Sequence, residues 1–201
     1  MNSATTLVFI HGNGATKDSF NYIKNNIDLS EYQIIDIEYK SDLGFYTNLL
    51  HISMYLQQLK LNKVFFIAHS LGGIYAKHLA NDLSLKDNVV GAVTISTPYG
   101  GCASAYLLRI INQRNKLLRD IAPSSKPITS LNVFPENWNA VVTTRGSLLY
   151  VMEKNDGVVT YRSMTVHKNK MNIIEIDSTH FEIMLSPKLI LFIKEKLDLI
   201  K

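Results

Sequence analysis

Six short runs rich in β-branched and aromatic residues recur along the 201-residue chain, separated by stretches with helical periodicity. Strands that alternate with helices are typical of a parallel sheet covered by helices on both faces. A chain of this length suffices for one such domain with a substantial core. We therefore predict a single α/β domain over residues 1–201, with strands at Thr5–Ile10, Gln33–Ile37, Val64–Ala68, Val89–Ile95, Leu148–Met152 and Ile173–Ile176.

Three of the intervening stretches carry apolar residues three or four positions apart, which predicts amphipathic helices. They are Tyr46–Leu59, Ile74–Leu83 and Leu189–Leu197. Ser186 and Pro187 precede the last of these, as an N-cap followed by proline in the first turn.

The long connection over residues 99–146 exceeds what a simple crossover needs, and we interpret it as a cap-like or lid-like insertion at the edge of the sheet. It holds six basic and two acidic residues, so it carries the whole net charge of +4, and the rest of the chain balances at 15 against 15. Two interpretations stay open: a helix packed on its own domain, and a mobile or interfacial element over an apolar pocket. The pattern predicts one basic amphipathic helix, with Leu107, Ile110, Ile111, Leu117, Leu118 and Ile121 on one face and Arg109, Lys116 and Arg119 on the other.

Composition narrows the function classes. No apolar stretch approaches the roughly 20 residues of a membrane-spanning helix, and the amino terminus lacks the pattern of a secretory signal. A cytoplasmic protein is expected, although a mature secreted form would read the same way. Cys102 is the only cysteine, so neither a disulfide nor a structural zinc site is expected. The chain has no dense basic run of the kind that binds nucleic acid.

The third predicted strand ends at His69-Ser70-Leu71-Gly72-Gly73, and helical periodicity follows at once. A serine at the tip of a tight strand-to-helix turn is a nucleophile elbow, whose strained backbone requires small residues two positions before and after the serine. Ala68 and Gly72 meet that requirement, although alanine replaces the usual first glycine. We predict that Ser70 is a nucleophile, against the simpler alternative of a helix N-cap.

Around this motif the chain resembles the α/β-hydrolase family, in particular its small lipase and esterase branch. Four landmarks occur in that family's order: His11-Gly12, Ser70, Asp156-Gly157-Val158-Val159 and His180. The run Ser96-Thr97-Pro98-Tyr99-Gly100-Gly101 is also similar to lipase-type hydrolases. The resemblance covers nearly the whole chain and implies a minimal α/β-hydrolase fold: a six-stranded, mostly parallel sheet of order 2-1-3-4-5-6, with a helical insertion after the fourth strand.

A serine hydroxyl needs a base within hydrogen-bond reach and a carboxylate that orients the base. His180 follows the last predicted strand, at the sheet edge that presents Ser70, and is the predicted base. Asp156 is the predicted carboxylate, with Glu153 and Asp177 as open rivals. The other histidines are interpreted as structural, with His11 bracing its loop: His11, His51, His69, His78 and His167.

Two backbone N–H groups must face the oxygen that becomes negative during attack on a carbonyl. Leu71 supplies one by its position after the nucleophile, and the resemblance to H-G-x motifs implies that Asn13 supplies the other. In the expected strand order, the loops holding Asn13 and Leu71 follow neighbouring strands and meet at the point where open α/β sheets place ligands.

Competing chemistries fit less well. The Gly12-Asn13-Gly14 loop lacks the spacing of a phosphate-binding motif, the histidines show no metal-ligand pair, and haloalkane or epoxide chemistry on this fold would need a carboxylate at position 70. The sequence therefore predicts a serine hydrolase of carboxylic esters without metal or cofactor. The substrate is expected to be a small-molecule or lipid ester, with possible contact to an anionic membrane surface. A thioesterase, an amidase and a non-catalytic binding module stay open as alternatives.

Overall fold

In the computed structural model, residues 4–103, 105, 112–130, 133–148 and 151–201 are described. A six-stranded parallel sheet forms the centre, in the order β2-β1-β3-β4-β5-β6. The predicted fold class and strand order are confirmed. The strands are β1 (Thr6–Ile10), β2 (Gln33–Ile37), β3 (Val64–His69), β4 (Val89–Ile95), β5 (Trp138–Thr143) and β6 (Asn172–Ile176).

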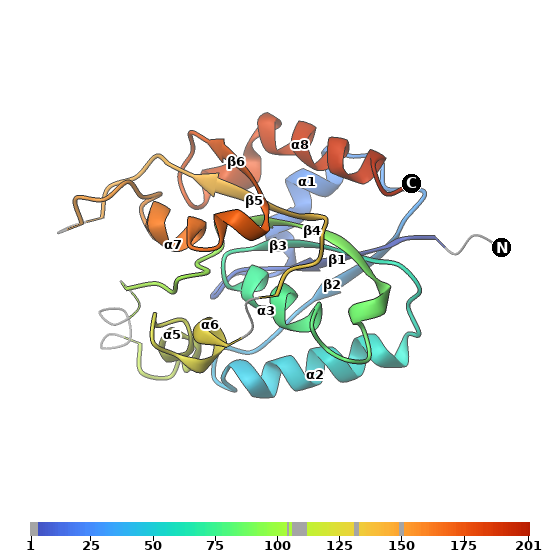
Figure 1. Cartoon of the computed structure of the whole chain (residues 1–201), viewed down its shortest axis with the longest axis horizontal. Coiled ribbons are helices and arrows are strands. Elements are labelled where there is room, and N and C mark those ends of the chain that lie inside the picture. The colour runs from blue at the N-terminus through green and yellow to red at the C-terminus, as the bar shows by residue number, and fades with distance from the viewer. Residues whose placement is uncertain (1–3, 104, 106–111, 131–132, 149–150) are drawn as a thin grey trace.

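Helices cover both faces of the sheet (Figure 1). The predicted amphipathic helices are present with shifted ends, as α2 (Phe45–Gln58), α3 (Leu71–Leu79) and α8 (Pro187–Asp198), and Pro187 is the first residue of α8. Short 3-10 turns occur at Lys17–Phe20, Lys86–Asn88, Lys168–Lys170 and Glu182–Leu185. The helices are α1 (Asn21–Asn26), α2 (Phe45–Gln58), α3 (Leu71–Leu79), α5 (Leu117–Asp120), α6 (Lys126–Thr129), α7 (Tyr161–Thr165) and α8 (Pro187–Asp198).

Alternate residues of the central strands feed two apolar cores. In β1, Val8 and Ile10 pack toward α2 and α3, whereas Leu7 and Phe9 pack toward α1 and α8. Because successive side chains of a strand point to opposite faces, a strand covered on both sides becomes apolar throughout. This explains the continuous apolar runs that made β1 and β3 recognisable in the sequence.

The fifth strand lies elsewhere than predicted. Trp138–Thr143 forms β5, whereas residues 148, 151 and 152 of the predicted strand lie outside any strand and residues 149–150 are outside the described part of the chain. Pairing with β4 and β6 selects residues 138–143 although Asn139 interrupts the apolar pattern. The Asn139 amide is satisfied inside the sheet, where it donates to the carbonyl of Ala92 at 3.1 Å. The connection from β4 therefore ends at Asn137, nine residues before the predicted boundary at 146.

The predicted basic helix is also shorter than expected. Residues 112–116 are not helical, and α5 begins at Leu117, so the prediction of a continuous helix through residues 107–121 is wrong. The backbone N–H of Lys116 donates to the carbonyl of Ser41 at 2.9 Å, which ties the turn to the loop before α2. Among the helices of the described residues, none combines the length and the apolar composition that spanning a bilayer requires. Four residues of the predicted helix lie outside the described residues: Leu107, Arg109, Ile110 and Ile111.

Candidate active site

Ser70 occupies a strained turn between β3 and α3. Its φ of 53° and ψ of −122° lie where residues other than glycine are rarely found. The turn is held because the N–H of Ser70 donates to the carbonyl of Ile95 at 2.8 Å. A Cβ on Gly72 would lie 2.1 Å from the carbonyl oxygen of Ile10, so only glycine fits there. The backbone thus presents the Ser70 hydroxyl at the carboxyl end of β3.

His180 reaches Ser70 from the loop after β6. Its Nε2 lies 3.0 Å from Ser70 Oγ, and its Nδ1 lies 2.8 Å from Asp156 Oδ2. The backbone N–H of His180 also donates to the carbonyl of Asp156 at 3.0 Å. Both the imidazole and the main chain of His180 are therefore oriented by residue 156, and an unbroken hydrogen-bond chain joins Ser70, His180 and Asp156.

The Asp156 carboxylate is buried and surrounded by donors. Oδ1 accepts from the backbone N–H groups of Val158 and Val159 at 3.0 and 2.7 Å, and Oδ2 accepts from the Thr143 hydroxyl at 2.5 Å as well as from His180. Burial by itself raises the pKa of Asp156, but the bonds from His180, Thr143 and Val159 outweigh it and hold the pKa below its ordinary value. The carboxylate is thus ionised at neutral pH and oriented on both oxygens.

The rival carboxylates lie in other surroundings. Glu153 accepts a hydrogen bond from the backbone N–H of Arg162 at 2.7 Å, and Asp177 is exposed. The sequence suggested that Asp156 directly follows the fifth strand. In the structure, β5 ends 13 residues earlier, at Thr143. A tight loop brings Asp156 back to the sheet edge, and this loop is closed by a β-bridge between Asn155 and Thr160.

Sequence reasoning missed the contribution of Thr143 and Ser96. Ser96 Oγ lies 2.8 Å from Thr143 Oγ1, so a row of hydroxyls runs from the end of β4 through β5 to Asp156. The Ser96 hydroxyl belongs to the run that resembled lipase-type hydrolases, which was the available signal. No sequence signal pointed to Thr143, because it fell within the predicted insertion over residues 99–146.

His69 forms a hydrogen bond with the main chain of His180. A ring nitrogen, Nε2, donates to the carbonyl of His180 at 2.9 Å. Burial, together with the neighbouring His180, lowers the pKa of His69 to about 3, so this ring is neutral and can serve as a fixed donor. His11 sits in the loop after β1, where it stacks on Tyr39 with ring centres 4.3 Å apart. The Tyr39 hydroxyl donates to the carbonyl of His11 at 2.8 Å.

Asn13 and Leu71 lie on loops from adjacent strands. The register pairs Ile10 of β1 with Ala68 of β3, so the segments that follow these residues meet. Leu71 is the first residue of α3, where a backbone N–H has no partner within the helix. Asn13 lines the same cavity as Ser70, and its side-chain oxygen accepts from the Asn115 amide at 3.1 Å. Asn13 and Leu71 therefore lie on neighbouring loops at the sheet edge that presents Ser70, and their role as oxyanion donors stays a prediction.

The Ser70 hydroxyl opens into a cavity of about 530 Å³. Leu118 and Ile121, from the connection between β4 and β5, form part of its wall. Within the described residues, no group of three or more His, Cys, Asp or Glu side chains is placed to hold a metal ion. Other apolar residues of the wall are Ala15, Pro98, Cys102, Ala105, Val158, Val159, Phe181, Met184 and Leu185.

Comparisons with known proteins agree with this architecture. No family model and no curated protein matches the sequence. Among solved structures, a lipase of Bacillus licheniformis in its mature form superposes with a TM-score of 0.67 at 15% identity, over 98% of this chain and 93% of that one. A bromoperoxidase of Bacillus anthracis gives 0.71 at 13% identity, over 98% and 92%.

The thioesterase RedJ of the prodiginine pathway in Streptomyces coelicolor gives a TM-score of 0.68 at 12% identity, over 97% of this chain and 91% of that one. These proteins carry different activities on one architecture, and at such low identity the likeness is one of fold. The chemistry of this chain therefore has to be argued from its own residues.

Proposed function

The chain has the α/β-hydrolase fold, and on this premise we propose that it is a serine hydrolase of carboxylic esters. The observation that carries the proposal is the unbroken hydrogen-bond chain from Ser70 Oγ through His180 to Asp156. The stability of the fold does not require a strained serine, a base at 3.0 Å and a buried carboxylate to occur together. An acyl-transfer site requires all three.

In the proposed first step, Ser70 Oγ attacks the ester carbonyl carbon while His180 Nε2 takes the hydroxyl proton. The carbonyl oxygen becomes an oxyanion, and the backbone N–H groups of Asn13 and Leu71 donate to it. Asp156 stays ionised throughout and stabilises the imidazolium through Nδ1–H. When the tetrahedral intermediate collapses, His180 returns the proton to the departing alkoxide, so the alcohol leaves and Ser70 carries the acyl group.

In the second step, His180 removes a proton from water, which attacks the acyl carbonyl. The same N–H pair stabilises the second oxyanion, and His180 then protonates Ser70 Oγ as the acid departs. The balance is one ester and one water converted to one acid and one alcohol, with no cofactor consumed.

The apolar wall of the cavity supports an acyl-lipid or other apolar acyl substrate. Thioesters use the same machinery and stay the second candidate, because the fold neighbours include a thioesterase. Arg119 lies next to the wall residue Leu118 and is exposed, and this supports a further proposal that the protein contacts anionic membrane surfaces.

Labelling with a fluorophosphonate tests whether Ser70 is a nucleophile. We expect one covalent adduct on the wild-type chain and none on Ser70→Ala. Ser19→Ala is the matched control, because Ser19 lines the same cavity while its hydroxyl donates to the carbonyl of Thr16 at 2.8 Å rather than to a histidine. An unlabelled wild-type chain with intact fold would favour the non-catalytic binding module.

Hydrolysis of nitrophenyl esters of increasing acyl length, with matched thioesters, tests the substrate class. The apolar cavity predicts that kcat/KM rises with chain length, because each buried methylene contributes about 0.8 kcal/mol. A sharp optimum at acetyl would contradict the lipid-ester proposal but leave the proposed mechanism standing.

A further inference from the structure

The cavity beside Ser70 has two unlike walls, one on each face of the sheet. Cys102, Leu118 and Ile121 line it from the α2 and α3 face, where all three are buried in the apolar core. The other wall comes from the 3-10 turn at Lys17–Phe20 and from α1. Figure 1 shows α1 and α5 on opposite sides of the sheet. A substrate at Ser70 therefore meets a different surface on each side.

The wall on the α1 face is open to solvent. Phe181, from the loop after β6, is 69% exposed, and Asp18 and Asn21 are exposed as well. The two halves of an ester suit such different walls, because the acyl group stays on the nucleophile until water attacks, whereas the alcohol leaves first. The buried apolar wall fits the acyl half, and the exposed wall fits the alcohol half. The exposed wall also includes Ser19, Tyr22, Met184 and Leu185.

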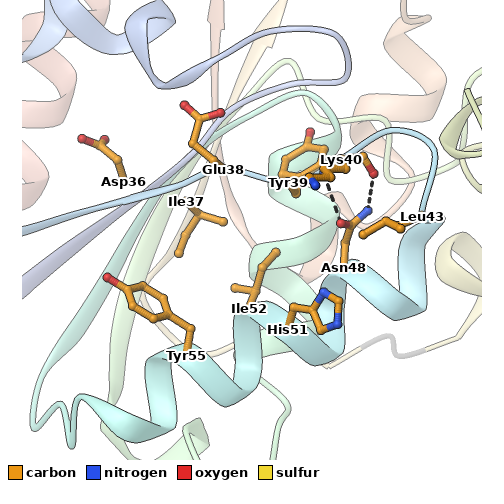
Figure 2. A pocket seen from close by; sticks show the side chains of 10 residues that line it. All are labelled: Asp36, Ile37, Glu38, Tyr39, Lys40, Leu43, Asn48, His51, Ile52 and Tyr55. Carbon is orange, nitrogen blue, oxygen red and sulfur yellow. Dashed lines mark hydrogen bonds between the residues drawn. The ribbon is translucent and has the colours of Figure 1, made fainter.

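Asp18 is the only Asp, Glu, Lys or Arg in the described wall of this cavity. Other charged groups nearby are engaged. Lys24 pairs with Asp36, and the Glu38 carboxylate accepts from the backbone N–H of Lys17 at 2.7 Å. Asp36 and Glu38 line a separate groove between β2 and α2 (Figure 2). Asp18 forms no ion pair with any residue that the structure describes. Its carboxylate is therefore able to attract a positive charge in the substrate.

Tyr22 and Phe181 add two aromatic rings to the same wall. The Phe181 ring lies edge-on to the His180 ring, with the ring centres 5.1 Å apart, so this wall reaches the proposed base. A cation is attracted to a carboxylate by its charge and to an aromatic ring by the quadrupole of the ring. A quaternary ammonium group can use both attractions. The carboxylate and the rings together therefore match a cationic alcohol.

We propose that the substrate is the ester of a cationic alcohol, with its ammonium group against Asp18 and its acyl half against Leu118 and Ile121. This inference rests on the proposed function, because it assigns the two sides of the same acyl-transfer site. Asp18 selects the alcohol by charge, since it attracts a cation and repels an anionic alcohol. The steps at Ser70 and His180 are unchanged, and the alcohol leaves through the exposed side.

Two esters of one fatty acid test the proposal. One is the choline ester, and the other is its uncharged analogue, in which a tert-butyl group replaces the trimethylammonium group. We expect the ratio of their kcat/KM values, charged over uncharged, to be about three- to fivefold lower in Asp18→Asn than in the wild type. Comparing ratios between variants removes the intrinsic reactivity of the two esters.

Salt provides a readout that a merely structural role of Asp18 would not move. The wild-type ratio should fall between about 0.01 M and about 1 M salt, because the screening length drops from about 30 Å to about 3 Å. In Asp18→Asn the ratio should depend much less on salt. A wild-type ratio as insensitive to salt as that of Asp18→Asn would contradict the role of the charge.

Asp87→Asn is the matched control. Asp87 is also an exposed aspartate in the first turn of a 3-10 helix, but it lies just before β4, at the opposite end of the strands from Ser70. This variant should keep the wild-type ratio. Equal ratios in the wild type and Asp18→Asn overturn the proposal, and so does an equal fall in both variants.

Labelling of Ser70 by a neutral fluorophosphonate separates this inference from the proposed function. Excess choline should slow the labelling of the wild type more than that of Asp18→Asn. Labelling that choline slows equally in both, or in neither, overturns the inference and leaves the proposed function standing. A folded wild-type chain that is not labelled at all contradicts the proposed function, and the inference fails with it.

Discussion

Asp156 and Lys77 are both almost completely buried, but the fold compensates only one of them. The Asp156 carboxylate receives four hydrogen bonds, from Thr143, His180, Val158 and Val159. The Lys77 ammonium, two turns into α3, donates to the carbonyl of Ser130 at 3.4 Å, and no described carboxylate forms an ion pair with it.

The pKa values follow this contrast. Donors outweigh burial at Asp156 and keep its pKa below the ordinary value, whereas burial lowers the pKa of Lys77 from 10.5 to about 8. Burial alone does not decide the state of an ionisable group, because the number and sign of its partners matter as much. The polar partners are concentrated where the proposed chemistry needs a fixed charge.

The largest expected effect comes from removing the base that joins Asp156 to Ser70. His180→Ala should lower kcat/KM for a nitrophenyl ester at least about 10⁴-fold, and Ser70→Ala should do the same. Because the two residues act as a unit, the double variant should be no slower than either single one. An additional loss in the double variant would contradict the proposed proton transfer.

Asp156→Asn should cost about 10³–10⁴-fold in kcat. The asparagine keeps the shape but removes the charge, so it no longer stabilises the imidazolium or fixes its tautomer. Glu153→Gln is the control, and it should keep near-normal kcat because that carboxylate binds the Arg162 backbone instead. A Glu153→Gln variant as impaired as Asp156→Asn would reopen the choice of carboxylate.

Thr143→Val removes one of the four donors and should lower kcat about tenfold. It should also raise the pKa of Asp156, because a bond to the ionised form is lost. The depressed pKa contributes stability above pH 3.8 that is lost as the pH falls, so the variant should unfold at a higher pH during acid titration. Thr94→Val is the control, since Thr94 bonds the Asn139 carbonyl away from the site.

Lys77→Met should increase the free energy of unfolding at pH 7 by about 1–3 kcal/mol, because an uncompensated buried charge is removed. The folded pKa lies below the unfolded one, so the unfolded chain binds more protons between pH 8 and 10.5. Wild-type stability should therefore rise relative to the variant across that window. Chemical denaturation at several pH values checks this, with exposed Lys188→Met as the control. If the free energies of unfolding of the wild type and Lys77→Met differed by the same amount at every pH in that window, the lowered pKa of Lys77 would be contradicted.

Five of the six strands were predictable because they are short apolar runs that turns or polar residues delimit. β5 was not predictable, because Asn139 interrupts its apolar pattern. The buried Asn139 amide is tolerated there because it donates to the carbonyl of Ala92 in the neighbouring strand. The rival run at Leu148–Met152 had better local composition, but the sheet does not pair with its described residues. Strand pairing thus overrode local preference.

For the candidate site, the sequence by itself determined the position of the elbow. The elbow requires small residues around Ser70 for steric reasons. Because this requirement is local, a short stretch of sequence is enough to recognise it. Tertiary structure alone decided that Asp156, rather than Glu153 or Asp177, meets His180, and that Thr143 and Ser96 extend the network. Those partners come from β5 and from the loops after β4, β5 and β6, which lie side by side only once the strands have paired. Hydrogen bonds act over about 3 Å, so choosing among residues far apart in the chain requires the assembled sheet.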